Sequence, residues 1–545
     1  MTDRSVPAPL FAPDRALGGL LGWRRLLVAI VAGAASALAL APVNAFPVLW
    51  LTMPVLIWLL DGAQGRPDAG PIRRLAPAFS VGWGFGFGYF VGGLWWIGVA
   101  FLAESAEFVW LMPFGVLLLP AGLALFWGFG AAIARLFWLT GWRRILVFAV
   151  VFSLTEWLRG HVLTGFPWNA FGYTLMPVPV MMQIASVVGL WGVTLLAFLV
   201  FAAPALVIGR GAWRRVADRR VFLAIVALFL ADIGFGVVRL AGDDGATVPG
   251  VALRLVQPMI PQDEKWAPGR DDEVLDRYLS LSATGMEEGK PAPFTVLIWP
   301  ETALPFFLAD RPNALAAIGA VLPPGSTLLT GAARAEPVLG EELAARVFNS
   351  IFVIDSDGVI RDAYDKVHLV PFGEYLPFEA LFSRLGLRQM VALPGGFDAG
   401  RALRTMSIPN APSFGPLICY EIIFPGAAVD GTDRPRWLVN VTNDAWFGDT
   451  PGPRQHFHQA VIRAVEEGLP LVRAANSGIS GIVDAYGKII SQRSVGSVGI
   501  VDGPLPDTVR ATIYSRFGDR LYFGLIVAAI IAIVAACFTQ TKARD

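Results

Sequence analysis

Charged residues are scarce in this chain. Asp, Glu, Lys and Arg make up only 16% of its 545 residues, whereas about a quarter of the residues of a typical soluble protein are charged. Hydrophobic residues reach 55%, and the mean hydropathy is +0.57. This composition excludes an ordinary soluble protein and indicates an integral membrane protein.

Cysteine is almost absent as well. The chain contains only Cys419 and Cys537, and Cys537 lies inside an apolar run near the C-terminus. No disulfide framework is therefore available, and cysteine usage does not report the compartment. The formal net charge is zero, which argues against nucleic acid as a partner.

Eight apolar runs have the composition of membrane-spanning helices. Three of them, residues 26–40, 48–60 and 145–158, are shorter than the roughly 20 residues that a span needs, so flanking residues must complete them. Pro42 and Asn44 predict a tight hairpin between the first two. The other five runs cover residues 79–102, 109–133, 184–208, 221–238 and 521–538. We therefore expect about eight transmembrane helices.

Arginines gather in alternate connections between these runs, and short cytoplasmic loops of membrane proteins collect Lys and Arg. The connections at residues 103–108 and 160–183 contain no arginine, and Arg159 stands directly before the second one. The segments expected on the cytoplasmic side of the membrane carry Arg24, Arg25, Arg66, Arg73, Arg74, Arg135, Arg143, Arg144, Arg210, Arg214, Arg215, Arg219 and Arg220. If all eight runs span a bacterial inner membrane, both termini are cytoplasmic and the long polar segment after the seventh run is periplasmic.

Within the third run, Gly84, Gly88 and Gly92 recur every four residues, a spacing that lets helices approach closely. We interpret them as packing residues of a helical bundle. Glu156 and Asp232 lie within or at the ends of apolar runs, where ionisable groups are functional candidates by default.

From about residue 247 to residue 506, the composition becomes that of a globular α/β domain. Predicted strands alternate with helical stretches at residues 271–288 and 455–467, which indicates layered sheets with helices outside. The strands are expected at residues 251–257, 295–299, 326–330, 350–354, 413–418, 437–442 and 481–483. The predicted domains are a membrane domain (1–246), a globular domain (247–506) and a last helix with the C-terminus (507–545).

Three segments of this domain carry groups suited to acyl transfer: Glu301 in Trp-Pro-Glu, Lys366 in Tyr-Asp-Lys, and Cys419 in Cys-Tyr-Glu. A carboxylate can take the proton of a thiol, the thiolate can form a thioester, and an ammonium can stabilise the oxyanion. Each residue also has a structural alternative. Cys419 could be a buried packing thiol, Glu301 an acid at a helix N-terminus, and Lys366 a solvated loop residue.

The order of these segments resembles the nitrilase, or carbon–nitrogen hydrolase, superfamily, whose triad is Glu, Lys and Cys. Residues 440–447 and 473–478 also read like that superfamily. The resemblance implies an αββα sandwich of two sheets. It also implies that Glu301 is the general base, Lys366 the oxyanion stabiliser and Cys419 the nucleophile.

A nitrilase-like domain inserted before the last of about eight transmembrane helices is similar to the apolipoprotein N-acyltransferase family. Residues 156–169 and 257–266 resemble the family's membrane-proximal loop and the start of its outer domain, although Pro258 stands where the family commonly has a small residue. The resemblance implies a ping-pong transfer of the sn-1 acyl chain of a phospholipid, typically phosphatidylethanolamine. The acceptor is the N-terminal amine of an S-diacylglyceryl-cysteine apolipoprotein, and the carrier is a thioester on Cys419. No cofactor or metal is implied.

The resemblance also implies supporting residues. The backbone N–H of Tyr420 would be a second oxyanion donor, and Glu374 would hold Lys366 or the acyl acceptor in place. An anion beside a thiol opposes thiolate formation, so we interpret Glu421 as a positioning group. Candidate substrate contacts are Trp266, Phe378, Phe382, Trp446 and Phe447.

Residues 376–390 carry Phe378, Leu381, Phe382 and Leu385 at the spacing of one helical face, with Arg384 and Arg388 beside it. This pattern predicts either a lid that dips into the outer leaflet or a helix packed on the domain.

His456 and His458 fall on different faces of a predicted helix, and no Cys or acidic cluster completes a metal site around them. We expect a structural or substrate-contact role for this pair. His368 is expected to support Lys366.

Two other functions fit part of the sequence. A membrane-tethered amidase that hydrolyses a small amide would use the same triad and would need no lipid. A transporter or lipid-binding receptor would explain the apolar runs but would leave the coincidence of Glu301, Lys366 and Cys419 unexplained.

Overall fold

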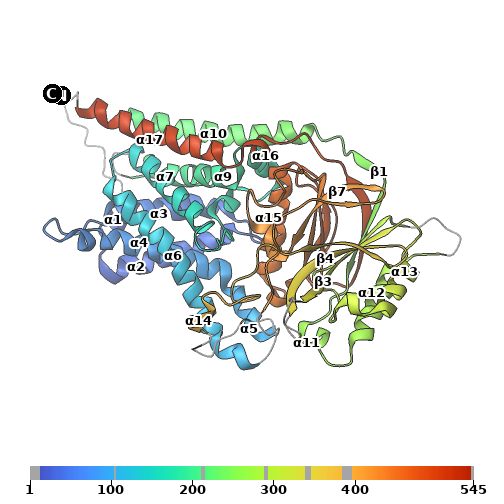
Figure 1. The fold of residues 1–545 in the computed structure, drawn as a ribbon. Coiled ribbons are helices and arrows are strands. Elements are labelled where there is room, and N and C mark those ends of the chain that lie inside the picture. Colours follow the sequence, from blue (N-terminus) through green and yellow to red (C-terminus); the bar gives the residue numbers. More distant parts are fainter. Residues whose placement is uncertain are drawn as a thin grey trace, which may run out of the picture. The chain divides into compact units, whose positions relative to one another are not determined.

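The computed structural model describes residues 13–103, 106–209, 215–287, 293–337, 345–382, 384, 389 and 396–541 (Figure 1). The chain forms two compact units. The helical unit comprises Met1–Trp95, Pro113–Val238 and Phe517–Asp545, and the sheet unit comprises Trp96–Met112 and Arg239–Arg516.

Helix covers most of each of the eight predicted apolar runs. The main helices are α2 (Gly22–Ser36), α3 (Leu49–Asp61), α4 (Pro71–Leu94), α6 (Met112–Leu136), α7 (Trp142–Arg159), α9 (Ala185–Ala202), α10 (Val216–Ala241) and α17 (Arg520–Thr541). Five segments of the described chain are long and apolar enough to cross a membrane: Gly22–Ala39, Pro71–Leu102, Val109–Leu136, Ala185–Leu206 and Val216–Ala241. The total of eight spans stays a prediction.

The third predicted run is not one continuous α-helix. Helix α4 ends at Leu94, and the chain continues as a 3₁₀ helix, Trp95–Val99, and the short α5 (Ala100–Ala103). Trp96 belongs to the sheet unit, where its Nε1 donates a hydrogen bond of 3.1 Å to Gln455 Oε1. Its ring also packs edge-on against Phe447 at 4.7 Å. These contacts tie the end of the run to the sheet unit.

The glycines of α4 allow close helix packing on two sides. A β-carbon on Gly88 would lie 2.0 Å from the carbonyl oxygen of Ile30 on α2, and one on Gly82 would lie 2.3 Å from that of Trp127 on α6. Both distances are far below van der Waals contact, so only glycine fits at these positions. The packing role predicted for this glycine row is confirmed.

Glu156 is buried within the helical unit and is fully partnered. Its carboxylate accepts hydrogen bonds from Trp127 Nε1 (2.8 Å), the backbone N–H of Phe171 (2.9 Å) and Arg159 Nε and Nη2 (2.8 and 2.9 Å). Arg159 in turn donates to the carbonyl oxygens of Phe166 and Trp168. Glu156 therefore anchors the loop after α7.

Asp232 on α10 differs from Glu156. It is only 3% exposed, and neither of its carboxylate oxygens has a hydrogen-bond partner within the described residues.

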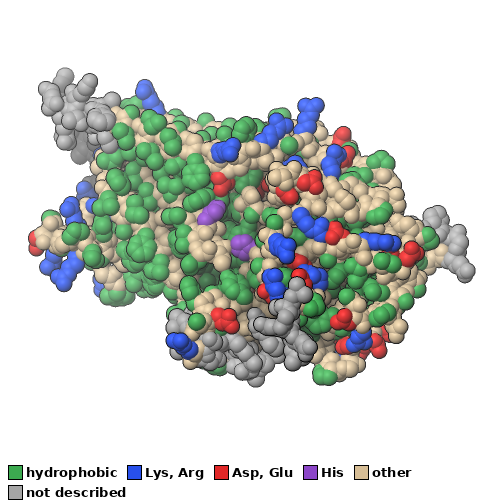
Figure 2. Space-filling view, in the orientation of Figure 1, with side chains coloured by type: hydrophobic (Ala, Val, Ile, Leu, Met, Phe, Trp, Pro, Cys, Tyr) green, Lys and Arg blue, Asp and Glu red, His purple; other side chains and the backbone are tan. Residues whose placement is uncertain are grey.

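Hydrophobic side chains dominate the surface of the helical unit on the face drawn in Figure 2, whereas charged side chains are scattered over the sheet unit. Many large apolar side chains of the helical unit are exposed, including Leu118, Phe129, Leu230 and Val238. An apolar helical surface of this kind is the one that lipid solvates.

The sheet unit contains two six-stranded sheets with the same pairing pattern. The first has the order β12-β1-β2-β3-β4-β5 and the second the order β11-β10-β9-β8-β7-β6. In each, three central strands are parallel, β1 to β3 and β7 to β9, and the outer strands are antiparallel. The strands are β1 (Thr247–Gln257), β2 (Val296–Trp299), β3 (Thr327–Pro337), β4 (Ala345–Asp355), β5 (Ile360–Asp365), β6 (Met406–Ile408), β7 (Ala411–Ile418), β8 (Trp437–Thr442), β9 (Leu471–Ala475), β10 (Ser480–Val483), β11 (Ile489–Arg493) and β12 (Gly499–Pro506).

Alternate residues of these strands build two separate cores. Ile298 of β2 packs in one cluster with Val439 of β8, which places one face of each sheet against the other. Leu297 faces the opposite way and packs with residues of α12 (Asp271–Ser282) and α13 (Pro312–Val321). Helix α15 (Pro451–Glu467) contacts β9 of the second sheet (Figure 1). The layers are helix, sheet, sheet and helix, as predicted.

The predicted strands all exist, but β5, β6, β9, β11 and β12 were not predicted. The helix expected at residues 271–288 ends at Ser282, which corrects that prediction. Gly285 lies just beyond, with a left-handed φ of 70° that an α-helix cannot continue through.

We expect Glu156→Gln to destabilise the helical unit, because it leaves the buried Arg159 guanidinium without its counter-charge. Breaking such a pair costs about 3–5 kcal/mol. The midpoint of unfolding in detergent should fall, and Glu156→Gln combined with Arg159→Met should recover part of the loss.

Glu273→Gln is the control, since Glu273 pairs with Arg270 on the exposed surface. Its midpoint should equal that of the unchanged protein. Equal midpoints for Glu156→Gln and Glu273→Gln would contradict the anchoring role.

Candidate functional site

The side chains of the predicted triad lie where strands end. Glu301 follows β2, Cys419 follows β7 and Lys366 follows β5. Strand β2 is the middle one of the three parallel strands of the first sheet, and β7 is an outer one of the three in the second. Groups at the carboxyl ends of parallel strands meet at one edge of a sheet. The sheets thus supply the carboxylate and the thiol from opposite sides.

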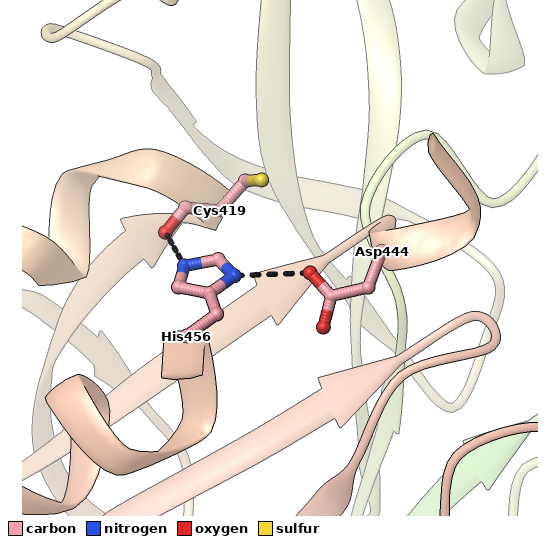
Figure 3. A group of neighbouring side chains, drawn as sticks. All are labelled: Cys419, Asp444 and His456. Atoms are coloured by element: carbon pink, nitrogen blue, oxygen red, sulfur yellow. Dashed lines mark hydrogen bonds and ion pairs between the residues drawn. The ribbon is translucent and has the colours of Figure 1, made fainter. Parts of the chain in front are cut away.

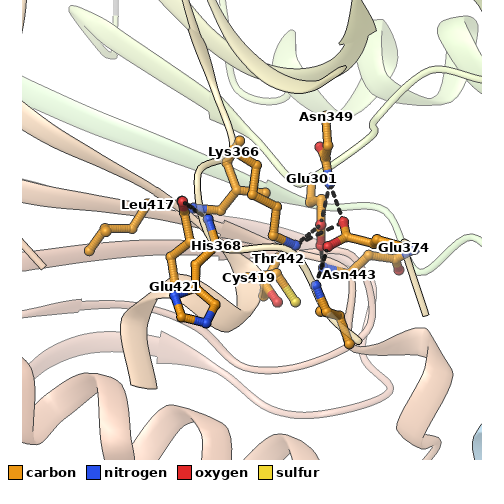
Figure 4. A network of polar contacts seen from close by, with 12 residues as sticks. Glu301, Asn349, Lys366, His368, Glu374, Leu417, Cys419, Glu421, Thr442 and Asn443 are labelled. Carbon is orange, nitrogen blue, oxygen red and sulfur yellow. Dashed lines mark hydrogen bonds and ion pairs between the residues drawn. The ribbon is translucent and has the colours of Figure 1, made fainter. Parts of the chain in front are cut away.

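The buried ammonium of Lys366 joins two carboxylates (Figure 4). Its Nζ lies 2.9 Å from Glu374 Oε1 and 3.4 Å from Glu301 Oε1. Asn349 on β4 bridges the same two oxygens, donating from Nδ2 at 2.8 Å to Glu301 and at 3.0 Å to Glu374. The second oxygen of Glu374 accepts the N–H of Val370 at 2.8 Å.

The second oxygen of Glu301 is held by the segment after β8. The backbone N–H of Asn443 donates to Glu301 Oε2 at 2.8 Å. The side chain of Asn443 donates to Gln262 Oε1 at 2.9 Å and accepts from Asn476 Nδ2 at 3.0 Å. Both oxygens of Glu301 are therefore fixed in direction.

Burial and neighbouring charges shift the pKa values of Lys366 and Cys419. Burial lowers the pKa of Lys366, but Glu374 and then Glu301 outweigh it, so the pKa is raised and the ammonium stays charged. Burial raises the pKa of the Cys419 thiol, Glu301 raises it further, and Lys366 opposes both. The resting thiol is protonated and needs a base to ionise.

Cys419 has a left-handed backbone conformation, with φ of 50°, at the start of a 3₁₀ helix, Cys419–Ile423. Such a conformation persists only where the surroundings enforce it. Figure 4 shows the sulfur on the side of Cys419 that faces the Lys366 ammonium.

A buried network of hydrogen bonds and an ion pair contacts the backbone of Cys419 (Figure 3). The carbonyl oxygen of Cys419 lies 3.1 Å from His456 Nε2, which must therefore carry the proton and donate. His456 Nδ1 lies 3.0 Å from Asp444 Oδ1 and 2.9 Å from Arg473 Nη2, and Arg473 also pairs with Asp444 at 2.9 Å. Burial and the charge of Arg473 lower the pKa of His456. Burial opposes ionisation of Asp444, but Arg473 and His456 lower its pKa to about 2.

The prediction that no Cys or acidic group lies near His456 is wrong, because Cys419 and Asp444 are its neighbours in the fold. One ligand atom each of Cys419, Asp444 and His456 lies within 4.8 Å of the others. These residues come from three separate elements, so their spacing in the chain does not reveal the group. The guanidinium of Arg473 already supplies a positive charge to Asp444 and His456, which disfavours a metal cation there.

Glu421 binds backbone groups on both sides of the site. Its Oε1 accepts the N–H groups of Val367 (2.7 Å) and His368 (3.1 Å) and the hydroxyl of Tyr364 (2.9 Å). Its Oε2 accepts the N–H of Ile418 at 2.7 Å. This carboxylate ties the segment that carries Lys366 to the strand that presents Cys419.

The aromatic rings near Cys419 pack on each other. His368 stacks on Phe424 with ring centroids 3.7 Å apart, and Tyr420 meets Phe424 edge-on at 5.0 Å. Tyr420 is buried, with 5% of its surface exposed.

The proposed substrate contacts are more exposed. Trp266 is 46% exposed and Phe378 68%, while Trp446 is partly buried and Phe447 packs on Trp96. Helix α14 (Glu379–Phe382) is short. Most of the predicted amphipathic segment, including Leu385 and Arg388, lies outside the described residues, as does the side chain of Phe382.

The sequence did not reveal Asn349, Asn443, Asp444, Arg473 or Lys265 as site residues. Lys265 lies on α11 (Gln262–Lys265) and is only 1% exposed. Asn443, Asp444 and Arg473 do lie in segments quoted for the nitrilase resemblance, and Lys265 lies in the segment 257–266 quoted for the family resemblance. Asn349 lies in none of these segments.

Comparisons with known proteins cover both parts of the chain. Residues 32–203 match the model of the apolipoprotein N-acyltransferase N-terminal domain, and residues 255–514 match that of carbon–nitrogen hydrolase. Among solved structures, an amidase from Nesterenkonia sp. is similar at 19% identity with a TM-score of 0.34, covering 52% of this chain and 98% of that chain.

Curated relatives match over nearly the whole length. The apolipoprotein N-acyltransferase of Brucella suis is 50% identical over 529 residues, 96% of this chain and 98% of the relative. That of Rhodopseudomonas palustris is 46% identical over 517 residues, 94% of this chain and 95% of the relative. With identity at this level from end to end, the chain belongs to the apolipoprotein N-acyltransferase family and is an N-acyltransferase.

Proposed function

We propose that this enzyme transfers the sn-1 acyl chain of a phospholipid such as phosphatidylethanolamine to the N-terminal amine of S-diacylglyceryl-cysteine apolipoproteins, the last step of lipoprotein maturation. The observation that carries the proposal is the meeting of a protonated thiol, a fixed carboxylate and a permanently charged ammonium. The family relationship supports the choice of substrates.

In the first half-reaction, Glu301 takes the proton of Cys419, and the thiolate attacks the ester carbonyl of the phospholipid. The negative charge that develops on the carbonyl oxygen is stabilised by Lys366 and by the backbone N–H of Tyr420. The ester C–O bond breaks, the proton returns from Glu301 to the departing oxygen, and a lysophospholipid leaves. The acyl chain stays on Cys419 as a thioester.

In the second half-reaction, the N-terminal amine of the apolipoprotein attacks the thioester. Glu301, again unprotonated, accepts the proton of the amine, and Lys366 stabilises the second oxyanion. The C–S bond breaks and the thiol is restored. Glu374 keeps the ammonium of Lys366 in place throughout, since it is the closer of the two carboxylates.

We infer that the globular domain (247–506) lies on the periplasmic side of the inner membrane, between a membrane domain (1–246) and the last helix (507–545), with both termini cytoplasmic. The distribution of arginines in the sequence supports this orientation. Both substrates are anchored in the outer leaflet, so a site held just above it replaces a three-dimensional search and orients the ester.

Phe378 supports a lipid-facing role for the segment after Glu374. Its side chain is 68% exposed and its φ is 52°, a left-handed conformation for a large apolar residue. We propose that Phe378 and Phe382 enter the outer leaflet and that Trp266, Trp446 and Phe447 line the path of the acyl chain.

Incubation of the enzyme with phospholipid should add the mass of one acyl chain to the intact protein. Cys419→Ala should add none, because the thioester then has no sulfur. A peptide with an S-diacylglyceryl-cysteine N-terminus should remove the added mass from the wild type. Release of ammonia from small amides with no acyl adduct would contradict the proposal and favour an amidase.

Glu301→Gln should slow formation of the acyl-enzyme by about 10²- to 10⁴-fold, the usual contribution of a general base. The rate constant comes from a time course of intact mass with phospholipid in excess. Glu336→Gln is the control, since Glu336 is half-exposed and pairs with Arg334. Equal rates for the two variants would exclude Glu301 as the base.

Phe378→Ser with Phe382→Ser should weaken acylation from phospholipid vesicles, because it removes apolar side chains that enter the leaflet. The unfolding midpoint should not change, since Phe378 is mostly exposed. Val359→Ser removes an apolar side chain that is 44% exposed at the turn between β4 and β5, and it serves as control. Unchanged kinetics in the double variant would remove the lipid-facing role.

A further inference from the structure

Lys265 is a buried amine beside the site that the triad does not use. It is 1% exposed, although it belongs to the polar sequence Gln-Asp-Glu-Lys of α11. The other two charged residues of α11, Asp263 and Glu264, are exposed, and Glu264 pairs with Arg270. Lys265 Nζ lies 6.0 Å from the centroid of the Trp266 ring, and Glu301 is near enough for its charge to oppose the lowering of the Lys265 pKa by burial.

A chain of hydrogen bonds fixes α11 against Glu301. Gln262, three residues before Lys265 and thus on the same side of this helical turn, accepts from the side chain of Asn443. The backbone N–H of Asn443 donates to Glu301. The turn is closed by the N–H of Lys265, which donates to the carbonyl oxygen of Pro261 at 3.0 Å.

Lys366 alone does not offset the carboxylates of the pocket. Glu301 and Glu374 carry two negative charges, and Lys366 supplies one positive charge, which lies closer to Glu374. The remaining donors to Glu301 are the neutral amides of Asn349 and Asn443. Negative charge that no cation offsets opposes ionisation of the neighbouring Cys419 thiol.

We propose that Lys265 is a positioning residue whose ammonium offsets the negative charge that Glu301 places beside Cys419 and so favours ionisation of the thiol. The proposal rests on the proposed function only in taking Cys419 as the nucleophile. It adds a second cation to the site, with a role distinct from that of Lys366.

The two cations respond differently to pH. Burial lowers the pKa of Lys265 to about 8, with Glu301 opposing that shift, whereas the pKa of Lys366 is raised. The charge of Lys265 is therefore complete below about pH 7 and is lost as the pH rises through 8, while Lys366 stays charged. Asp444 and His456 also lie near Cys419, but Asp444 is ionised and His456 neutral across this range.

The test is the alkylation rate of Cys419 by iodoacetamide in the full-length protein in detergent, with Cys537→Ala as background. It reports ionisation of the thiol and needs no lipid. Lys265→Met should slow alkylation at least about tenfold at pH 6 to 7, the effect of one pKa unit. The ratio of the wild-type rate to the Lys265→Met rate should shrink toward one above about pH 9, because deprotonated lysine and methionine are then both neutral.

Lys265→Arg keeps its charge at every pH, so its rate should match the wild type below pH 7 and exceed it above pH 8. Lys488→Met is the control, because Lys488 is exposed on a turn, and its alkylation should follow the wild type. A wild-type to Lys265→Met ratio that is the same at all pH values would assign Lys265 to packing and overturn the proposal. So would equal rates of these two proteins at pH 6 to 7.

The same preparations are tested for acyl transfer from phospholipid. If wild type forms no acyl adduct but the pH-dependent ratio appears, the proposed function fails and the charge-balancing role stands. If the adduct forms and the ratio is constant, the role of Lys265 fails and the function stands.

Discussion

The buried ammonium of Lys366 is the charge on which the geometry of the site depends. A buried cation is tolerated only when several acceptors surround it, and here they come from different elements: Glu301 after β2 and Glu374 in the loop after β5. Asn349 on β4 bridges both carboxylates. The requirement to neutralise one ammonium therefore fixes the direction of the carboxylate next to the nucleophile.

The buried carboxylates of the site differ in what compensates their charge. Asp444 has a guanidinium partner, and its pKa is low. Burial raises the pKa of Glu421, which is compensated mainly by backbone N–H groups. Glu301 has two amide donors and a cation at 3.4 Å that it shares with Glu374.

The sequence was enough to predict that Glu301, Lys366 and Cys419 share one site, because each follows a strand and stands in a recognisable segment. It could not identify their partners. Asn349 lies in the middle of β4, where one polar residue in a strand carries no signal. Asp444 and Arg473 are 29 residues apart and meet only because β8 and β9 are neighbours. Lys265 reads as a surface residue, and only the packing of α11 against the segment after β8 buries it.

The unpredicted strands have a similar explanation. Strands β5 and β11 lie at the edges of their sheets and are only half-buried, so the alternation that marks a strand is weak there. Strand β9 is fully buried and short, and such a run cannot be told from a helix segment by periodicity.

The pairing pattern of the two sheets explains why Glu301 and Cys419 face each other. Each sheet has three parallel strands, and Glu301 follows the middle one of the first sheet while Cys419 follows an outer one of the second. The cluster that includes Ile298 and Val439 joins the two faces, and Cys419 packs against it. The alignment of thiol and carboxylate is therefore a property of the packing between the sheets. Since packed interiors transmit small displacements, a change of volume in that core would move Glu301 relative to Cys419 without touching either residue.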